Sequence, residues 1–326
     1  MKLNQLRNIV AIAERGSLRA AARDLGLAQP ALSRSVQELE HELGVQLFER
    51  RARGMILTPM GLAFVRRASN VMTEVRRARE EIEQLDGGTG GNVAAAMSIV
   101  PHLAIAPHML RPFRKRYPNV ELLLIEGLYP TVESRLKDGS IDFYVGPPPE
   151  QNLAPELISE LLFENERKIF CRKGHPLAGA KSLRELADCD WMTTSVTYTA
   201  ARELNDLFSR QNLPMPRLAL RSQSALTLMI SLANSDVLAM VPKQWAEFPF
   251  TVDAFETIDI GELTPAPPIV LIMRGGLPLT PAAEFLADLV RRHLPPATEP
   301  APAEAKKRPF KARRNAAPAP PSGTTS

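Results

Sequence analysis

Residues 16–50, GSLRAAARDLGLAQPALSRSVQELEHELGVQLFER, determine how this chain begins to fold. Ser17 is a good N-cap for a short helix, which closes at Gly26. Pro30 stands where the next helix can begin, and apolar residues then recur at helical spacing. Two short strands follow around a basic turn. The order of helix, tight turn, helix and basic two-stranded turn predicts a winged helix-turn-helix domain over residues 1–57.

The second helix of such a unit enters the major groove of DNA, with its early residues against the base edges. Arg34 can donate two hydrogen bonds to guanine, and Gln29 can form a similar pair with adenine. The arginines of the wing are placed for contact with the phosphate backbone or the minor groove. The alternative for any single arginine is a solvated surface position. The predicted DNA-binding residues are Gln29, Pro30, Ser33, Arg34, Arg50, Arg51 and Arg53.

Residues 58–86 predict one long helix, with Thr58 as its N-cap and Pro59 at its first helical position. Apolar residues at 3-4 spacing form a heptad-like seam along it. Such a helix can pack on its own domain or pair with a second chain. Its length, and the glycine-rich hinge at 87–91 that follows, favour pairing. The predicted dimerisation residues are Val65, Ala68, Met72, Val75 and Ile82.

The rest of the chain divides into a folded body and a basic tail. Residues 92–294 alternate apolar strands with helices, which predicts an α/β domain with a largely parallel sheet. Residues 295–326 are rich in proline and alanine, carry six basic and two acidic side chains, and are predicted to be disordered. Residues 1–86 hold 14 basic and 11 acidic side chains. This distribution favours a polyanionic partner at the two ends of the chain.

Several function classes are excluded by the sequence. Cys171 and Cys189 are too few for a disulfide framework or a four-thiolate zinc site, and fit a reducing cytoplasm. No secretory signal fits the N-terminus, and no stretch is apolar enough to predict a membrane span. A glycine-rich phosphate loop, a HExxH motif and a Gly-x-Ser-x-Gly elbow are all missing. We therefore expect a cytoplasmic protein that is not an enzyme and uses no cofactor or metal.

Five motifs at the N-terminal end, in the expected order, resemble the LysR-type transcriptional regulators. They are Gly16-Ser17-Leu18-x-Ala20-Ala21, Gln29-Pro30-Ala31-Leu32-Ser33, Leu39-Glu40-x-Glu42-Leu43-Gly44, Leu47-Phe48-Glu49-Arg50 and Leu57-Thr58-x-x-Gly61. The resemblance implies a helix-turn-helix at about 18–37 and a dimerising linker helix. It carries the family's DNA contacts onto Gln29, Pro30, Ser33, Arg34 and Arg53. Ala28 departs from the family's usual serine or threonine, so a helix-capping hydroxyl is absent there.

The resemblance continues through the body. Its motifs are Leu136-x-x-Gly139-x-Ile141-Asp142, His175-Pro176-Leu177-Ala178 and Leu238-Ala239-Met240-Val241-Pro242. They imply a two-lobed, periplasmic-binding-protein-like (type 2) effector domain, with lobe one at 92–165 and 269–293 and lobe two at 166–268. The body is most similar to the toluenesulfonate-type regulators, through Glu126-Gly127-x-Tyr129-Pro130 and Leu277-Pro278-x-Thr280-Pro281-Ala282-Ala283.

An effector in such a domain is expected in the cleft between the lobes, at the carboxyl ends of strands, where helix N-termini and free backbone N–H groups favour anions. Ser98 ends the first strand, and a hydroxyl-rich loop follows a strand of lobe two. The alternative roles are structural: a packing histidine at His102 and ordinary turns for the hydroxyls. The predicted effector-binding residues are Ser98, His102, Tyr129, Thr131, Thr193, Thr194, Ser195, Thr197 and Ser222.

The resemblance therefore implies a transcriptional regulator that binds double-stranded promoter DNA as a homodimer or homotetramer. It would respond to a small anionic metabolite, such as an aromatic carboxylate or sulfonate. Movement of the lobes would pass through the hinge to the linker helices and alter the DNA. Two alternatives share the two-lobed fold: a solute-binding receptor, disfavoured by the absence of an export signal, and an enzyme, disfavoured by the absence of a nucleophile–base pair.

Overall fold

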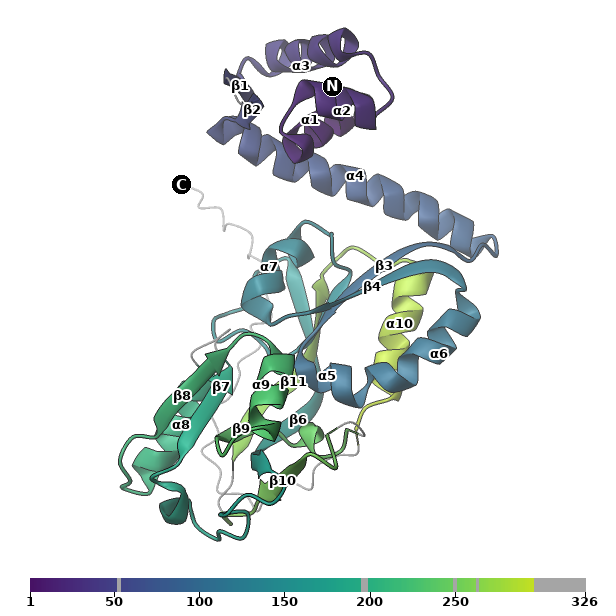
Figure 1. Ribbon diagram of the computed structural model, residues 1–326. Coiled ribbons are helices and arrows are strands. Elements are labelled where there is room, and N and C mark those ends of the chain that lie inside the picture. Colours follow the sequence, from purple (N-terminus) through teal and green to yellow (C-terminus); the bar gives the residue numbers. More distant parts are fainter. Residues whose placement is uncertain (52–53, 195–198, 249–250, 262–263, 296–326) are drawn as a thin grey trace, which may run out of the picture.

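A computed structural model shows a small helical domain, one long helix and a two-lobed α/β domain (Figure 1). The structure describes residues 1–51, 54–194, 199–248, 251–261 and 264–295. The tail predicted to be disordered thus lies almost entirely outside the described residues. Among the described helices, none is both long and apolar enough to span a bilayer.

The N-terminal domain consists of three helices and a wing. Its elements are α1 (Leu3–Arg15), α2 (Leu18–Asp24), α3 (Gln29–Leu43), β1 (Phe48–Arg51) and β2 (Gly54–Leu57). The Ser17 hydroxyl accepts a hydrogen bond from the amide of Ala20 at 3.1 Å and so caps α2. Ala28 occupies the N-cap of α3 without a side-chain bond, as its methyl group requires. The carboxylate of Glu40 accepts from the amide of Leu47 at 2.7 Å, which fixes the wing against α3.

The long helix α4 (Pro59–Leu85) begins where Thr58 accepts a hydrogen bond from the amide of Gly61 at 2.9 Å. A side chain at Gly61 would collide with the backbone of Leu47, so glycine permits this close approach. The first half of α4 completes the core of the N-terminal domain, where Phe64 and Val65 pack against α1 and α3 residues. Its second half crosses lobe one of the α/β domain (Figure 1).

One continuous path of strands connects both lobes, in the order β4-β3-β5-β11-β6-β9-β7-β8, with β10 paired to β6. The strands are β3 (Gly90–Met97), β4 (Asn119–Glu126), β5 (Phe143–Gly146), β6 (Leu157–Arg172), β7 (Asp190–Thr194), β8 (Arg217–Ser222), β9 (Leu238–Pro242), β10 (Phe255–Ile258) and β11 (Pro265–Arg274). The strand β3 pairs in parallel with β4 and β5, and β7 pairs in parallel with β8 and β9. By contrast, β6 and β11 pair antiparallel with each other and with β5, β9 and β10. The prediction of a largely parallel sheet is therefore wrong, because two long strands cross between the lobes in opposite directions.

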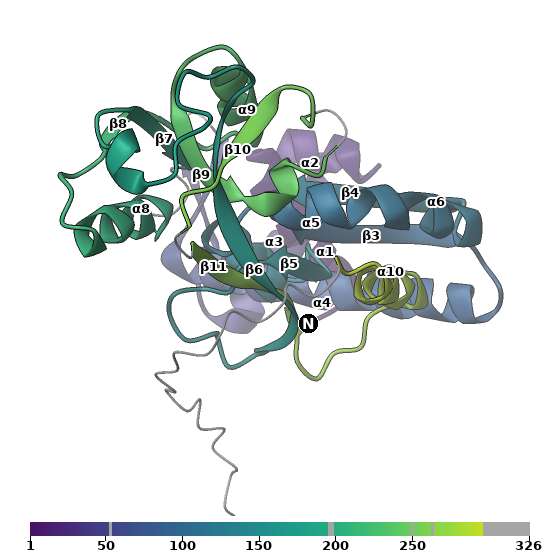
Figure 2. The same ribbon diagram turned by 90° about the horizontal axis from the view of Figure 1, so that it is seen from below.

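Helices cover both lobes. In lobe one they are α5 (Ile99–Ala104), α6 (Ala106–Arg116), α7 (Tyr129–Lys137) and α10 (Pro281–Arg292). Lobe two holds α8 (Thr199–Arg210), α9 (Ala225–Ala233) and the 3-10 turns η1 (Leu183–Leu186) and η2 (Lys243–Trp245). Figure 2 shows α6 and α10 at the end of lobe one, away from lobe two. Each lobe has its own apolar core: Phe113 and Leu286 are fully buried in lobe one, and Trp191 meets Phe208 edge-on in lobe two.

The connection between α4 and the sheet is shorter than the predicted hinge at 87–91. Gly90 and Gly91 pair with Asn119 and Val120 as the first residues of β3, because parallel pairing with β4 captures them. Only residues 86–89 lie between α4 and the sheet. At the other boundary, Glu166 faces Pro265 within the crossing strands, so the lobes join inside β6 and β11.

Candidate functional site

The outer face of α3 presents several of the predicted DNA-binding residues. Gln29, Pro30 and Arg34 are exposed on this face, and Ser33 is half-buried. The helix lies at the outer edge of the N-terminal domain, away from the α/β domain (Figure 1). A basic side chain and an amide at the start of an exposed helix provide the donors and acceptors that base edges need.

The wing is described only in part. Arg51 is exposed, and its guanidinium donates to the carboxylate of Glu49 at 2.9 Å. Arg50 belongs to β1 and faces Met55 in the β1–β2 pair. Arg53, the third predicted wing residue, lies outside the described residues.

The helix α4 has a more complex surface than the predicted seam. Val65 packs in the N-terminal core, and Ala68 is only 2% exposed, because the first half of α4 closes that domain. Met72 is half-buried. The prediction that Val65 and Ala68 belong to a dimerisation seam is therefore wrong, because Val65 packs in the N-terminal core and Ala68 is buried within the single chain. Exposed or half-exposed small and apolar residues instead follow 4-3-4-3 spacing along the second half, at Val71, Val75, Ala78, Ile82 and Leu85.

A buried ion pair attaches α4 to lobe one. The guanidinium of Arg77 donates to Asp142 at 2.6 Å and to the carbonyl oxygen of Gly139 at 2.9 Å. The Arg77 and Asp142 side chains are 7% and 8% exposed. The second carboxylate oxygen of Asp142 accepts from the amide of Ala94 in β3 at 2.8 Å. Burial raises the pKa of Asp142 to about 6, and the bond from Ala94 opposes that rise.

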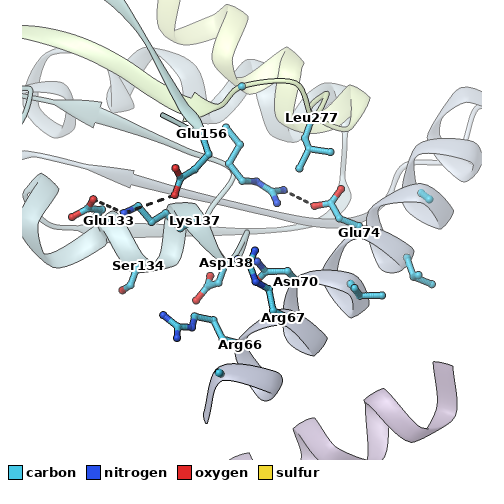
Figure 3. Close-up of a pocket in the computed structure, with 16 residues that line it drawn as sticks. Arg66, Arg67, Asn70, Glu74, Glu133, Ser134, Lys137, Asp138, Glu156 and Leu277 are labelled. Atoms are coloured by element: carbon cyan, nitrogen blue, oxygen red, sulfur yellow. Dashed lines mark hydrogen bonds and ion pairs between the residues drawn. The ribbon is translucent and has the colours of Figure 1, made fainter. Parts of the chain in front are cut away.

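Two further contacts extend this attachment along α4. Glu74 accepts from Arg274 of β11 at 2.6 Å, as the dashed line in Figure 3 shows. Gln84 donates to the carbonyl oxygen of Gly90 and accepts from the amide of Ala282 in α10, each at 2.9 Å. These bonds fix the position of α4 against lobe one.

A cavity of about 1290 Å³ lies between the middle of α4 and lobe one. Figure 3 shows that its walls carry charges of both signs, with Lys137 placed between Glu133 and Glu156. Val71, Val75 and Ala78 of α4 also line it. The cavity is thus continuous with the free apolar face of α4.

A second cavity, of about 600 Å³, lies between the two lobes. Four predicted effector residues line it, from three separate parts of the chain: Ser98, Tyr129, Thr193 and Thr194. Ser98 is only 3% exposed, and its hydroxyl has no hydrogen-bond partner among the described residues. Burial raises the pKa of Tyr129 to about 12, so this phenol stays protonated. A buried hydroxyl without a partner points to a ligand or water as its missing partner.

Other predicted effector residues do not line this cavity. The ring of His102 is turned toward its own helix, with Nδ1 3.0 Å from the carbonyl oxygen of Ser98. Thr131 donates to the carbonyl oxygen of Leu128 at 2.9 Å. Ser222 accepts from the amide of Ser224 at 3.1 Å and forms a turn. Local backbone bonds thus engage all three. Ser195 and Thr197 lie outside the described residues.

The structure adds two arginines that the sequence reasoning missed. Arg167 of β6 and Arg202 of α8 both line the cavity between the lobes. The Arg167 side chain is 11% exposed, and burial lowers its pKa to about 10. Arg167 forms an ion pair with Glu203 of α8. Arg202, at 58% exposure, pairs with Glu150 at 3.2 Å. The sequence did not predict a role for Arg167, because this residue lies in the crossing strand β6 and reaches the cavity only in the tertiary fold.

Clusters of metal-ligating side chains are absent from the part of the chain that the structure describes. Within the described residues, no group of three or more histidine, cysteine, aspartate or glutamate side chains is placed to hold a metal ion. The described cysteines, Cys171 and Cys189, are free thiols.

Comparison with known families gives a match to the N-terminal domain and a match to the two-lobed domain. Residues 3–62 match the model described as a bacterial regulatory helix-turn-helix protein of the lysR family. Residues 87–295 match the LysR substrate binding domain.

Curated relatives match over most of the chain. The SDS degradation transcriptional activation protein of a Pseudomonas species is 31% identical over 294 residues, covering 88% of this chain and 95% of the relative. The HTH-type transcriptional regulator GbpR of Rhizobium radiobacter is 29% identical over 251 residues, covering 76% and 83% of the two chains.

Solved structures share the fold. The LysR family regulator CbnR in complex with its target DNA aligns with a TM-score of 0.65 and 23% identity, over 90% of this chain and all of that one. A full-length OxyR variant from Pseudomonas aeruginosa aligns with a TM-score of 0.66 and 22% identity, over 93% and 99%. The predicted fold of a helix-turn-helix domain and a two-lobed α/β domain is confirmed.

Proposed function

The chain belongs to the LysR family of transcriptional regulators, and from that premise we propose which of its residues contact DNA and which bind its effector. Proteins of this family bind DNA and small-molecule effectors and form oligomers. They are transcriptional regulators, not enzymes, so neither the receptor nor the enzyme alternative is favoured.

For DNA, we propose that α3 enters the major groove with Gln29, Pro30, Ser33 and Arg34 toward the bases. The exposure of Arg34 and its neighbours on the outer face of α3 supports this role. The wing residues Arg50, Arg51 and Arg53 would follow the phosphate backbone. We place the complex in the cytoplasm and expect it to act as a homodimer or homotetramer.

For the effector, we propose a small anion, such as an aromatic carboxylate or a sulfonate, in the cavity between the lobes. The single observation that carries this proposal is the buried Ser98 hydroxyl, which lines the cavity and has no hydrogen-bond partner in the described part of the chain. Thr193, Thr194 and Tyr129 add neutral polar groups, and Arg167 supplies positive charge. The similarity to an activator of SDS degradation agrees with a sulfate or sulfonate headgroup.

A thermal-shift experiment tests the effector proposal. The probes are benzoate, benzenesulfonate and octyl sulfate, each beside its uncharged counterpart: benzamide, benzenesulfonamide and octanol. A ligand that binds only the folded protein raises the melting temperature by mass action. We expect at least one anion to raise it more than its uncharged counterpart does.

Matched serine variants locate the site. Ser98→Ala should remove the shift given by the effective anion, because the cavity loses its free hydroxyl. Ser222→Ala should leave the shift unchanged, because that hydroxyl binds its own turn. Equal shifts in wild type and Ser98→Ala would place the effector elsewhere.

A further inference from the structure

The charged side chains that line the described part of the cavity between the lobes are each paired within the protein. Arg167 pairs with Glu203, Arg202 pairs with Glu150, and the remaining charged lining residue, Glu133 of lobe one, pairs with Lys137. Among the described residues, an anion that enters this cavity therefore meets no uncompensated cation. It can gain a charged partner only by replacing one of the glutamates.

The two arginine pairs differ sharply in burial. The side chains of Arg202 and Glu150 are 58% and 53% exposed, so water screens their attraction and either partner can part at little cost. The Arg167 side chain is only 11% exposed and has lost most of its hydration. A buried guanidinium needs an anion beside it, whether that anion belongs to the protein or to a ligand.

Glu203 is positioned so that its carboxylate can leave Arg167 when another anion binds there. It approaches Arg167 from α8 and does not line the cavity. The oxygen that meets Arg167 is buried, but the side chain as a whole is 27% exposed, so its other atoms reach water. A carboxylate that can return to solvent loses less on leaving than a fully buried one would. Arg167 lies in the wall of the cavity, within reach of a ligand on its open side.

We propose that Glu203 is a built-in counter-ion that an anionic effector replaces on Arg167. This inference rests on the proposed function and adds the residue that selects charge. A carboxylate, sulfonate or sulfate group takes over the guanidinium of Arg167, and Glu203 turns to solvent. An uncharged compound of the same shape cannot make this exchange, because it would leave Arg167 without an anion.

The exchange also links the effector to the lobes. The amide of Arg167 donates to the carbonyl oxygen of Thr264 at 2.8 Å, and the Thr264 hydroxyl donates to the carbonyl oxygen of Arg167. These bonds hold the crossing strands together where the lobes join. The Arg167–Glu203 pair ties α8 of lobe two to that junction, and loss of the pair frees α8 to move.

The test compares Glu203→Gln with Glu150→Gln in the full chain, by calorimetric titration of the three anions and their uncharged counterparts. Glu203→Gln leaves Arg167 without its counter-ion, so an anion should bind at least about tenfold more tightly, which corresponds to about 1.4 kcal/mol. Glu150→Gln should change affinity less than about twofold, because its pair is exposed. Uncharged compounds should not distinguish the variants.

Two more variants keep the test informative if Glu203→Gln fails to fold. Glu203→Asp keeps the negative charge on a side chain that is one methylene shorter, so the carboxylate lies farther from Arg167. The gain in anion affinity should therefore be smaller than in Glu203→Gln. The double variant Arg167→Gln with Glu203→Gln removes both charges, and should fold but lose its preference for anions over their uncharged counterparts.

The remaining outcomes overturn the exchange and separate it from the proposed function. Weaker or unchanged anion binding by Glu203→Gln, with binding still lost in Ser98→Ala, would keep the effector site and overturn the exchange alone. Binding of uncharged compounds only would overturn both the exchange and the anionic class. A gain in Glu150→Gln equal to that in Glu203→Gln would show a general charge effect in place of a specific exchange.

Discussion

Arg34 is the residue of α3 whose chemistry is best suited to reading a base. Its exposed guanidinium can form two hydrogen bonds to guanine, so Arg34→Ala should weaken specific binding by roughly 1–3 kcal/mol. Binding to the operator and to random DNA is measured by fluorescence anisotropy at one salt concentration. Arg15→Ala is the control, because Arg15 ends α1 and pairs with Asp24 of α2 at 2.7 Å, so it is not part of α3. Equal losses on both DNAs would mean that Arg34 contacts only phosphate.

Arg77 is the residue on which the joint between α4 and lobe one depends. Arg77→Met should lower the free energy of unfolding by about 3–5 kcal/mol, because Asp142 would keep a buried charge without its cation. Arg15→Met is the control. Arg15 pairs with Asp24, and their side chains are 52% and 41% exposed, so the loss should stay below about 1 kcal/mol.

Urea unfolding of the two variants measures both effects. We also expect Arg77→Met to bind effector but to lose the effector's influence on DNA binding, because α4 would no longer follow lobe one. Equal stability of the two variants would show that the buried pair contributes nothing to the joint.

The cleft residues show what a single sequence can predict. Ser98 and Thr193–Thr194 were predicted because they stand at the ends of strands, where a local pattern marks the edge of a sheet. Arg167 and Glu203 are separated by 36 residues and meet only when α8 packs beside β6. No local pattern marks such a pair. His102 and Thr131 were predicted from their positions, one helical turn after Ser98 and at the start of the next helix, but each side chain bonds to its own backbone instead.

At the scale of elements, α4 is the helix most at variance with its sequence pattern. A regular 3-4 seam indicates one partner, yet α4 packs against the N-terminal core with one face and against lobe one with another. Val65 serves the first contact and Ala68 is buried within the chain, so the free face begins later, at Val71. The apolar residues of the heptad-like pattern therefore belong to two packing surfaces, one in each half of the helix.

The free face of α4 gives a test of dimerisation. Ile82 is 68% exposed in the single chain, and Ile82→Glu should give monomers, because two like charges would meet across a two-fold seam. Leu62→Glu is the control: Leu62 is 59% exposed but lies on another face of the helix. Sedimentation velocity measures the oligomer. Monomers from both variants, or from neither, would contradict this seam.

At the scale of the whole molecule, the shortened connection changes how a signal can travel. A flexible hinge at 87–91 would let α4 swing free of the effector domain. Parallel pairing of Gly90 and Gly91 and the bonds of Gln84 instead fix the end of α4 to β3 and α10. If an effector moves the lobes, we therefore expect the movement to reach α4 through its packed contact with lobe one, and the N-terminal domain to move with α4.

The distribution of charge over the whole chain carries the last prediction. Residues 295–326 hold six basic and two acidic side chains, and residues 1–86 also carry a net positive charge, with 14 basic and 11 acidic side chains. A cationic segment near DNA releases condensed counterions, and each phosphate it neutralises steepens the log–log salt dependence by roughly 0.9. Deletion of residues 296–326 should therefore weaken non-specific DNA binding and flatten its salt dependence.

The same deletion should leave folding, oligomeric state and effector response unchanged, because it removes none of the described core residues of the two lobes. A control that separates charge from length replaces only the basic side chains of the tail with glutamine, at Lys306, Lys307, Arg308, Lys311, Arg313 and Arg314. If charge is responsible, this variant behaves as the deletion does in a salt titration with random DNA. A deletion that aggregates or no longer responds to effector would show that the tail packs on the body, and a salt dependence equal to that of wild type would show that it does not contact DNA.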